Sequence, residues 1–102
     1  MNKTRRVCIN DEDYDILICR PSIWGNKFTH IKNRRTRAEF VVDTVAEAIK
    51  QYEIALLENK DLMSKIPDLI GKRLGCTCKN GKPCHGDILV RLAENLRYKS
   101  IF

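Results

Sequence analysis

The segment 73–87 constrains the fold of this chain more than any other. It reads RLGCTCKNGKPCHGD and holds three of the five cysteines and one of the two histidines. Apolar residues lead into Cys76 and Cys78, a Lys-Asn-Gly-Lys turn follows, and Pro83 precedes an apolar run of helical period. This order predicts a strand, a turn and a helix, with the cysteines gathered where the strand ends and the helix starts.

Strands are also predicted near the N-terminus. Short apolar runs at 5–9 and 15–20 are separated by the polar segment 10–15, and they indicate two strands joined by a polar turn. Pro21 cannot donate to a ladder, so the second strand should end before it. Leu74–Cys78 forms the remaining strand, and a strand followed by a short turn and a helix is an α/β unit.

Helices are predicted between these strands and at the end of the chain. Thr36–Glu39 matches the capping-box pattern, which predicts a helix start at Thr36. A short helix capped by Asp61 and a turn begun by Pro67 should follow, and Gly71 should end this region. The apolar stripe of the first helix comprises Val41, Val45, Ala48, Ile49, Tyr52 and Leu56, and that of the last comprises Ile88, Leu89, Leu92, Ala93 and Leu96.

Composition narrows the class of protein. The 102 residues suit one domain, 1–102, and their 43% hydrophobic and 31% charged content is typical of a globular protein in solution. No apolar run approaches the roughly 20 residues of a membrane helix, and acidic residues at 11–15 replace the apolar core of a signal peptide, so we expect a cytoplasmic protein with no membrane association. The net charge of +6 would attract phosphate-bearing partners. Oligomeric state is left open.

The cysteines predict thiols or metal ligands rather than disulfides, because their number is odd and no export signal precedes them. Three thiols and one imidazole satisfy the ligand count of a structural zinc site, and no other cofactor is indicated. Against zinc, the Cys-x-Cys spacing is shorter than the usual knuckle, and adjacent Cys84 and His85 side chains would diverge on a helix. The four zinc ligands would be Cys76, Cys78, Cys84 and His85.

Three further interpretations of the same cluster stay open. In a catalytic one, Cys84 or Cys78 is a nucleophile whose pKa the helix start lowers, and His85 is the base. In a binding one, Gly86 lets the backbone approach a ligand and the neighbouring amides hold a phosphate or carboxylate, for which Asp87 competes. In the last, the cysteines simply pack and the histidine caps the turn.

A second candidate site is the loop 23–28. Gly25 and Asn26 tolerate sharp turns, and they place the only tryptophan, Trp24, where it could stack on a planar ligand or fill the core as a plug. Five Lys or Arg residues lie between positions 27 and 37, which indicates either a solvated basic loop or an edge that contacts phosphate.

With both motifs in view, the chain resembles domain-of-unknown-function family 4326, small proteins of bacteria and bacteriophages. The resemblance covers most of residues 15–97 and rests on Arg20–Asn26 (RPSIWGN), Thr36-Arg37, Gly75–Cys78 (GCTC) and Pro83–Asp87 (PCHGD). Lys27 replaces the proline that usually follows this asparagine, so the loop could bend differently. The resemblance implies which residues form the site, not which chemistry they perform.

The Cys-x5-Cys-His element is also similar to the C-terminal motif of domain-of-unknown-function family 488. This implies a Rossmann-like α/β fold in two or three layers, with a short, mainly parallel sheet. Ligands of such sheets bind beyond the carboxyl ends of the strands, where the Trp24 loop and the Cys84 turn would fall.

The leading hypothesis is therefore a domain that binds a nucleotide or nucleic-acid phosphate between the Trp24 loop and the helix start at Cys84-His85. The alternatives are a thiol- and histidine-dependent enzyme acting on a nucleotide or glycosidic bond, and a zinc-stabilised nucleic-acid or protein adaptor. The predicted ligand-binding residues are Arg20, Trp24, Gly25, Asn26, Arg35, Arg37, Gly86 and Asp87; the predicted catalytic residues are Cys84, His85 and Cys78.

Overall fold

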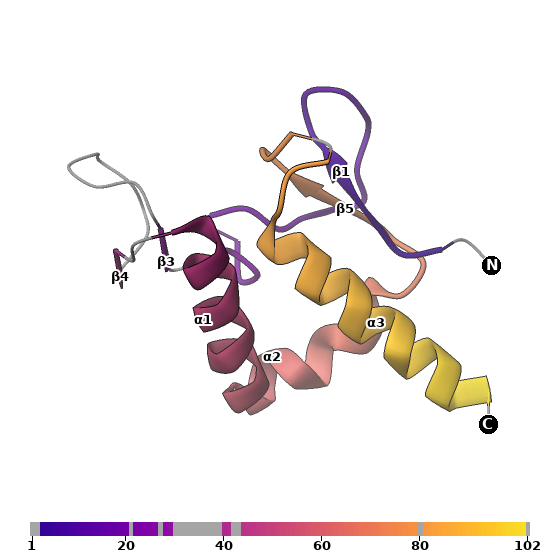
Figure 1. The fold of residues 1–102 in the computed structure, drawn as a ribbon. Helices are drawn as coiled ribbons and strands as arrows, with labels where there is room; N and C mark the ends of the chain where they lie inside the picture. Colours follow the sequence, from indigo (N-terminus) through magenta and orange to yellow (C-terminus); the bar gives the residue numbers. More distant parts are fainter. Residues whose placement is uncertain are drawn as a thin grey trace.

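A computed structural model describes residues 3–20, 22–26, 28–29, 40–41, 44–79 and 81–101. Within these ranges, three strands form one parallel sheet in the order β1-β5-β2, and two short strands form a second parallel pair. Figure 1 shows the helices gathered below the sheet. The elements are β1 (Arg5–Cys8), β2 (Ile16–Leu17), β3 (Phe28–Thr29), β4 (Phe40–Val41), α1 (Val45–Glu58), α2 (Lys60–Lys65), the 3-10 turn η1 (Ile66–Leu69), β5 (Arg73–Cys76) and α3 (His85–Ile101).

The small α/β fold with a short parallel sheet is confirmed. Strands β1 and β2 do not pair with each other, because β5 lies between them. The β1–β2 connection must therefore pass across β5. Gly75 makes the crossing possible: a Cβ atom there would lie 2.6 Å from Cγ of Tyr14 and 2.8 Å from Cγ2 of Ile9. A glycine inside a strand commonly marks such a close approach.

The helices cover the other face of β5, as Figure 1 shows for α3. Leu74 and Cys76 lie two residues apart in β5, so their side chains share one face, and both are buried in the main core. Helix α3 brings Leu89 and Ala93 to this core, while α1 brings Tyr52 and others. The fully assembled cluster comprises Ile18, Trp24, Tyr52, Leu56, Ile66, Leu69, Leu74, Cys76, Cys84, Ile88, Leu89 and Ala93.

Helix α1 begins later than the sequence predicts. Phe40 and Val41 belong to β4, and the helix starts at Val45 with Thr44 as its N-cap, whose Oγ1 accepts a hydrogen bond from the Glu47 amide at 3.0 Å. A helix that began at Thr36 would include residues 40 and 41, and this prediction is wrong because both residues are in a strand. Thr36–Glu39 itself lies outside the described residues. Thr44–Glu47 has the same Thr-x-x-Glu spacing, so the capping signal occurs twice and sequence alone did not discriminate between the two.

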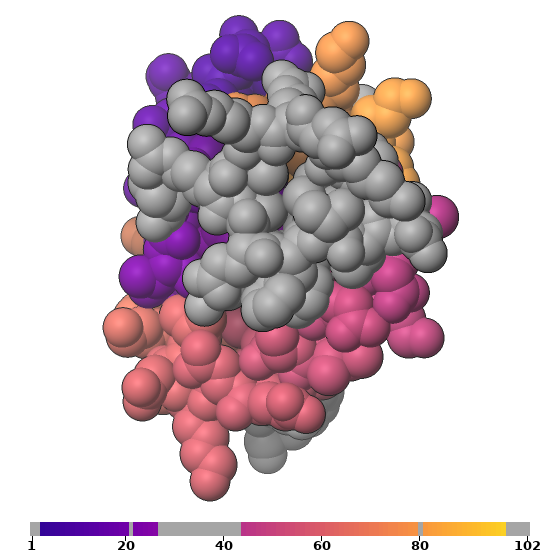
Figure 2. Space-filling model, turned by 90° about the vertical axis from the view of Figure 1, so that its left-hand side faces the viewer, coloured from indigo at the N-terminus to yellow at the C-terminus, as the bar shows by residue number. Residues whose placement is uncertain are grey.

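Helix α2 is capped two residues earlier than the sequence predicts. Asn59, not Asp61, accepts the hydrogen bond from the Leu62 amide at 3.1 Å. Pro67 begins a turn as predicted, because it lies at the start of η1. Figure 2 shows α1 and α2 together on the lower part of one face of the molecule, in magenta and pink.

The buried hydroxyl of Thr4 links the start of β1 to α3 and to the turn before β5. Thr4, fully buried just before β1, accepts a hydrogen bond from the Gly71 amide at 2.8 Å and donates one to Glu94 of α3 at 3.0 Å. Gly71 has a positive φ of 76°, which glycine adopts without strain, so the chain can turn sharply into β5. Among the described residues, no helix has both the length and the apolar character needed to cross a membrane.

Candidate functional site

Three thiols converge where β5 ends and α3 begins. Cys76 is the last residue of β5, Cys78 follows two positions later, and Cys84 directly precedes α3. The Sγ atom of Cys76 lies 3.6 Å from that of Cys78 and 3.4 Å from that of Cys84. All three sulfurs lie within 4.8 Å of one another. The strand–turn–helix order predicted from the sequence therefore brings its cysteines into one cluster.

These distances identify a thiol cluster rather than a disulfide. A disulfide bond is about 2.05 Å long, and all five cysteines are free. Two sulfurs that bind one zinc ion at about 2.3 Å with tetrahedral angles lie roughly 3.8 Å apart. The observed separations of 3.4 and 3.6 Å are close to that value. The residues present therefore fit a thiophilic metal ion.

The cluster is poorly accessible. Cys76 and Cys84 are each 2% exposed and His85 is 7% exposed, while Cys78 is half-buried. A nucleophile must reach its substrate, so the predicted catalytic role of Cys84 would require this region to open. A metal ligand needs no such access.

The close approach of the three thiols shifts their pKa values in opposite directions. The side-chain hydrogen bond between Cys76 and Cys78, together with that between Cys76 and Cys84, lowers the pKa of the Cys76 thiol. The same contacts with Cys76 raise the pKa of Cys84 and of Cys78, and burial adds to both increases. The cluster therefore gives up one proton readily and resists losing the others. A bound divalent cation would remove this conflict, because metal ligation stabilises thiolates.

His85 is held in one tautomer. Its Nε2 lies 2.7 Å from the carbonyl oxygen of Ile18, and a carbonyl can only accept, so Nε2 carries the hydrogen. Its Nδ1 then bears the lone pair and lies 3.6 Å from Sγ of Cys84. Burial lowers the pKa of His85, which favours the neutral ring. The ring of Tyr52 packs edge-on against it with centroids 4.9 Å apart.

Arg6 holds the connection that carries the thiols. Its side chain is 8% exposed, and its guanidinium donates to the carbonyl oxygens of Cys78, Lys79 and Lys82 at 3.1, 3.4 and 3.2 Å. Its Nε also forms an ion pair with Asp87 at 3.3 Å. One buried side chain from β1 thus fixes the backbone on both sides of the turn between β5 and α3.

The start of α3 has internal partners for its amides. The Gly86 amide donates to Sγ of Cys84 at 3.4 Å, and the Cys84 amide donates to Asp87 at 3.1 Å. A Cβ at Gly86 would lie 2.7 Å from Cδ1 of Ile18 and 2.9 Å from Cδ of Arg6. Gly86 thus permits close packing of α3 on neighbouring side chains, which accounts for this glycine without a ligand.

The structure places the Trp24 loop in the core. Trp24 is 4% exposed, which is the burial expected of a plug and leaves little ring surface for stacking. A Cβ at Gly25 would lie 2.9 Å from Cα of Arg20, and the Arg20 guanidinium donates to the Asn26 carbonyl at 2.8 Å. The Asn26 side chain in turn donates to the carbonyl of Ala48 at 3.3 Å. Arg35 and Arg37 lie outside the described residues, and their predicted roles stay predictions.

Tyr52 connects the two predicted walls of the site. Its hydroxyl donates to the carbonyl of Trp24 at 2.8 Å, while its ring contacts His85. Desolvation in this position raises the pKa of the Tyr52 hydroxyl. Sequence reasoning assigned Tyr52 only to an apolar stripe and overlooked Arg6. The one signal for Arg6 in the sequence was its place directly before the apolar run Val7-Cys8-Ile9 of the first predicted strand.

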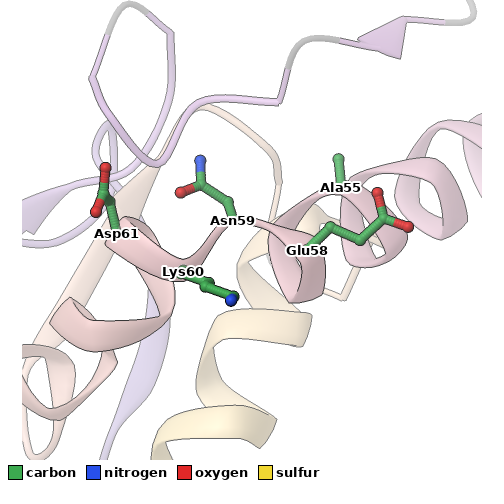
Figure 3. A pocket seen from close by; sticks show the side chains of 5 residues that line it. All are labelled: Ala55, Glu58, Asn59, Lys60 and Asp61. Atoms are coloured by element: carbon green, nitrogen blue, oxygen red, sulfur yellow. The ribbon is translucent and has the colours of Figure 1, made fainter.

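A surface depression at the junction of α1 and α2 lies apart from the thiols. Figure 3 shows its lining side chains, and Figure 1 places this junction at the far end of α1 from the connection between β5 and α3. It mixes both signs of charge, and the oxygen of Asn59 already caps α2. Nothing in it matches the predicted sites. Its lining residues are Ala55, Glu58, Asn59, Lys60 and Asp61.

Fold and site together define a class: a small α/β domain with a buried thiol–histidine cluster at the carboxyl edge of a short parallel sheet. The chain belongs to the family described as domain of unknown function (DUF4326), whose profile matches residues 1–95. It is also 36% identical over 85 residues to an uncharacterised 12.4 kDa protein from the nrdA-td intergenic region of Enterobacteria phage T4. The aligned region covers 82% of this chain and 71% of the relative. No solved structure matches the chain significantly. The family resemblance seen in the sequence is confirmed.

Proposed function

We propose that this domain is a metal-stabilised binding module that holds one zinc ion on Cys76, Cys78 and Cys84. The observation that carries the proposal is the convergence of three sulfurs within 4.8 Å of one another, from positions before and after a turn. Thiolate ligands select zinc, copper(I) or iron–sulfur clusters, and zinc is the usual structural ion of such sites. The ion would fix the connection between β5 and α3.

The local charges suit this role. Arg6 donates to the backbone of the turn, and its positive charge offsets a small part of the rise in the pKa of Cys78 that the contact with Cys76 causes. The start of α3 favours a negative sulfur at Cys84, because the Gly86 amide points at it. Contacts with Cys76 still hold the pKa values of Cys78 and Cys84 above the ordinary value, so a bound cation would have to complete the deprotonation of these two ligands.

Metal analysis of protein purified without added metal tests the proposal. We expect about one zinc per chain in the wild type and a loss of zinc in Cys76→Ala. Cys8→Ala is the matched control, because Cys8 is equally buried at the end of β1 and pairs in register with Cys76 but lies outside the cluster. A metal-free wild type that folds normally would refute the proposal.

A phosphate-bearing ligand, a nucleotide or nucleic acid, is the second candidate. Two exposed lysines, Lys79 and Lys82, lie on the connection between β5 and α3, at the carboxyl edge of the parallel sheet where α/β ligands bind. The net charge of +6 would assist the encounter. Because the amides at the start of α3 have internal partners, these lysines rather than the helix start would contact the phosphate.

Titration with a panel of nucleotides and short oligonucleotides tests this candidate. Amide NMR signals of residues 78–87 should shift on binding, and the Lys79→Ala/Lys82→Ala double variant should bind more weakly with a shallower salt dependence. Lys60→Ala, which removes an exposed lysine from α2, should leave binding unchanged. If no member of the panel shifts these signals, the phosphate-binding proposal fails while the zinc proposal stands.

A further inference from the structure

We infer that the zinc site is closed by His85, whose Nδ1 is the fourth ligand, so that the ion is structural and has no open position for a substrate. This inference rests on the proposed zinc site. Three observations carry it: the position of Nδ1 beside Sγ of Cys84, the hydrogen bond that fixes the ring, and the burial of Cys76, Cys84 and His85.

The first observation is geometric. Nδ1 of His85 lies 3.6 Å from Sγ of Cys84. A nitrogen and a sulfur bound to one tetrahedral zinc ion, at about 2.1 and 2.3 Å, lie roughly 3.6 Å apart. The Cys84 and His85 side chains would diverge only if both residues lay in the helix. The structure removes that objection, because α3 begins at His85 and Cys84 precedes it.

The second observation concerns orientation. Histidines that bind zinc commonly donate their other ring N–H to a carbonyl or carboxylate, which fixes the ring and increases the basicity of the ligating nitrogen. His85 shows this arrangement, since its Nε2 donates to the carbonyl of Ile18 at 2.7 Å. The lone pair of Nδ1 is therefore the one directed toward the cluster.

The third observation is enclosure. His85 is 7% exposed, and the ring of Tyr52 packs against it. A catalytic zinc site keeps a position for water or substrate, whereas a structural site is filled by protein ligands. Nδ1 does not belong to the group of ligand atoms within 4.8 Å of one another, so coordination requires the ring and the farther thiols to move toward each other.

X-ray absorption spectroscopy on the zinc-loaded wild type tests the inference directly. We expect three sulfur scatterers and one nitrogen, with the multiple scattering that an imidazole produces. Three sulfurs with one light atom and no imidazole signal would overturn the inference and leave the three-cysteine site standing. A wild type that binds no zinc would overturn the proposed function itself, so the two failures are distinguishable.

Ligand replacement gives a second test. His85→Ala should weaken zinc binding by at least about tenfold, since even outer partners of a ligand are worth this much. His85→Cys should restore tight binding, with the cobalt(II) charge-transfer absorption increasing as a fourth sulfur joins. Tyr52→Phe is the packing control, because it keeps the ring that contacts His85 and should leave the cobalt spectrum unchanged. Unaltered affinity and spectrum in both histidine variants would contradict the inference.

Discussion

Two neighbouring arginines in β1 have different surroundings and therefore different structural roles. Arg5 forms an exposed ion pair with Glu12, whereas the side chain of Arg6 is 8% exposed and donates to three carbonyl oxygens of the thiol-bearing connection. The alternation of a strand sends the two side chains to opposite faces. The guanidinium spreads five N–H donors over a planar fork, which the compact ammonium of lysine does not match, so Arg6 cannot be exchanged for lysine without loss.

We therefore predict different outcomes for two identical substitutions. Arg6→Lys should lower the free energy of unfolding by about 1–3 kcal/mol, because it leaves carbonyl oxygens of the connection without donors. Arg5→Lys should change it by less than about 0.5 kcal/mol, as exposed ion pairs contribute little. Urea unfolding of both variants measures the difference. Equal effects would show that the buried contacts of Arg6 do not support the fold.

At the scale of elements, the sheet depends on one connection that crosses it. The chain passes from β1 to β2 over β5, and Gly75 provides the space for Tyr14 and Ile9. Asp15 then fastens the end of this connection to β5, because its carboxylate accepts hydrogen bonds from the Arg73 amide and guanidinium at 2.8 and 3.1 Å. The short connection across β5 thus fits because Gly75 has no side chain, and the ion pair between Asp15 and Arg73 fastens its end.

Removing the space should destabilise the sheet. Gly75→Ala places a Cβ 2.6 Å from Cγ of Tyr14, and an atom so near the backbone cannot move without shifting the chain. We expect a loss of about 1–3 kcal/mol in unfolding free energy, the usual cost of overpacking. Gly81→Ala is a control for crowding, because a Cβ there meets no atom within 4 Å, although its φ of 84° adds local strain. A wild-type melting temperature for Gly75→Ala would contradict the crossing arrangement.

The ion pair should make stability depend on pH in a defined window. Hydrogen bonds from Arg73 lower the pKa of Asp15 from 3.8 to about 2. Because the folded pKa lies below the unfolded one, the contribution is fully present above about pH 4 and is lost as the pH falls toward 2. NMR titration of the carboxyl carbon checks the pKa directly, and Asp15→Asn should lose less stability than the wild type over this window. High salt should weaken the effect, since the pair is exposed. A pKa near 3.8 in the folded protein would refute this prediction.

For the whole molecule, the thiol cluster lies where three parts of the fold meet. Cys76 ends the central strand, Cys84 leads into α3, and both belong to the main core together with Tyr52 of α1. Filling this site with a tightly bound ion would therefore stabilise the sheet and both long helices together. A ligand present at 100 times its dissociation constant adds about 2.7 kcal/mol to the stability of the folded state.

Thermal unfolding should accordingly respond to chelation. We expect a zinc chelator to lower the melting temperature of the wild type by several degrees and added zinc to restore it. Cys76→Ala should melt at the lower temperature with or without chelator, because it lacks a ligand. Cys8→Ala should keep the response of the wild type. A chelator that leaves the wild-type melting curve unchanged would count against metal stabilisation.

Sequence alone determined much of this protein because its signals are local. The order strand, turn and helix at 73–87 follows from apolar period, turn residues and Pro83, and it was enough to bring Cys76, Cys78 and Cys84 together. The parallel sheet and the family resemblance were likewise predicted and are confirmed. The start of α1 was missed, because the Thr-x-x-Glu signal occurs at two places and only the pairing of β3 with β4 excludes the earlier one at residues 40 and 41.

Tertiary structure decided the rest, since it depends on contacts between residues far apart in the chain. Arg6 is 72 positions from Cys78, and the carbonyl that orients His85 is 67 positions away at Ile18. No local pattern encodes such distances. The same is true of Trp24, whose loop composition allowed either an exposed ring or a buried one until packing placed it in the core. Local residue types supplied the sulfur and nitrogen atoms of the site, and long-range packing determined their burial, tautomer and charge.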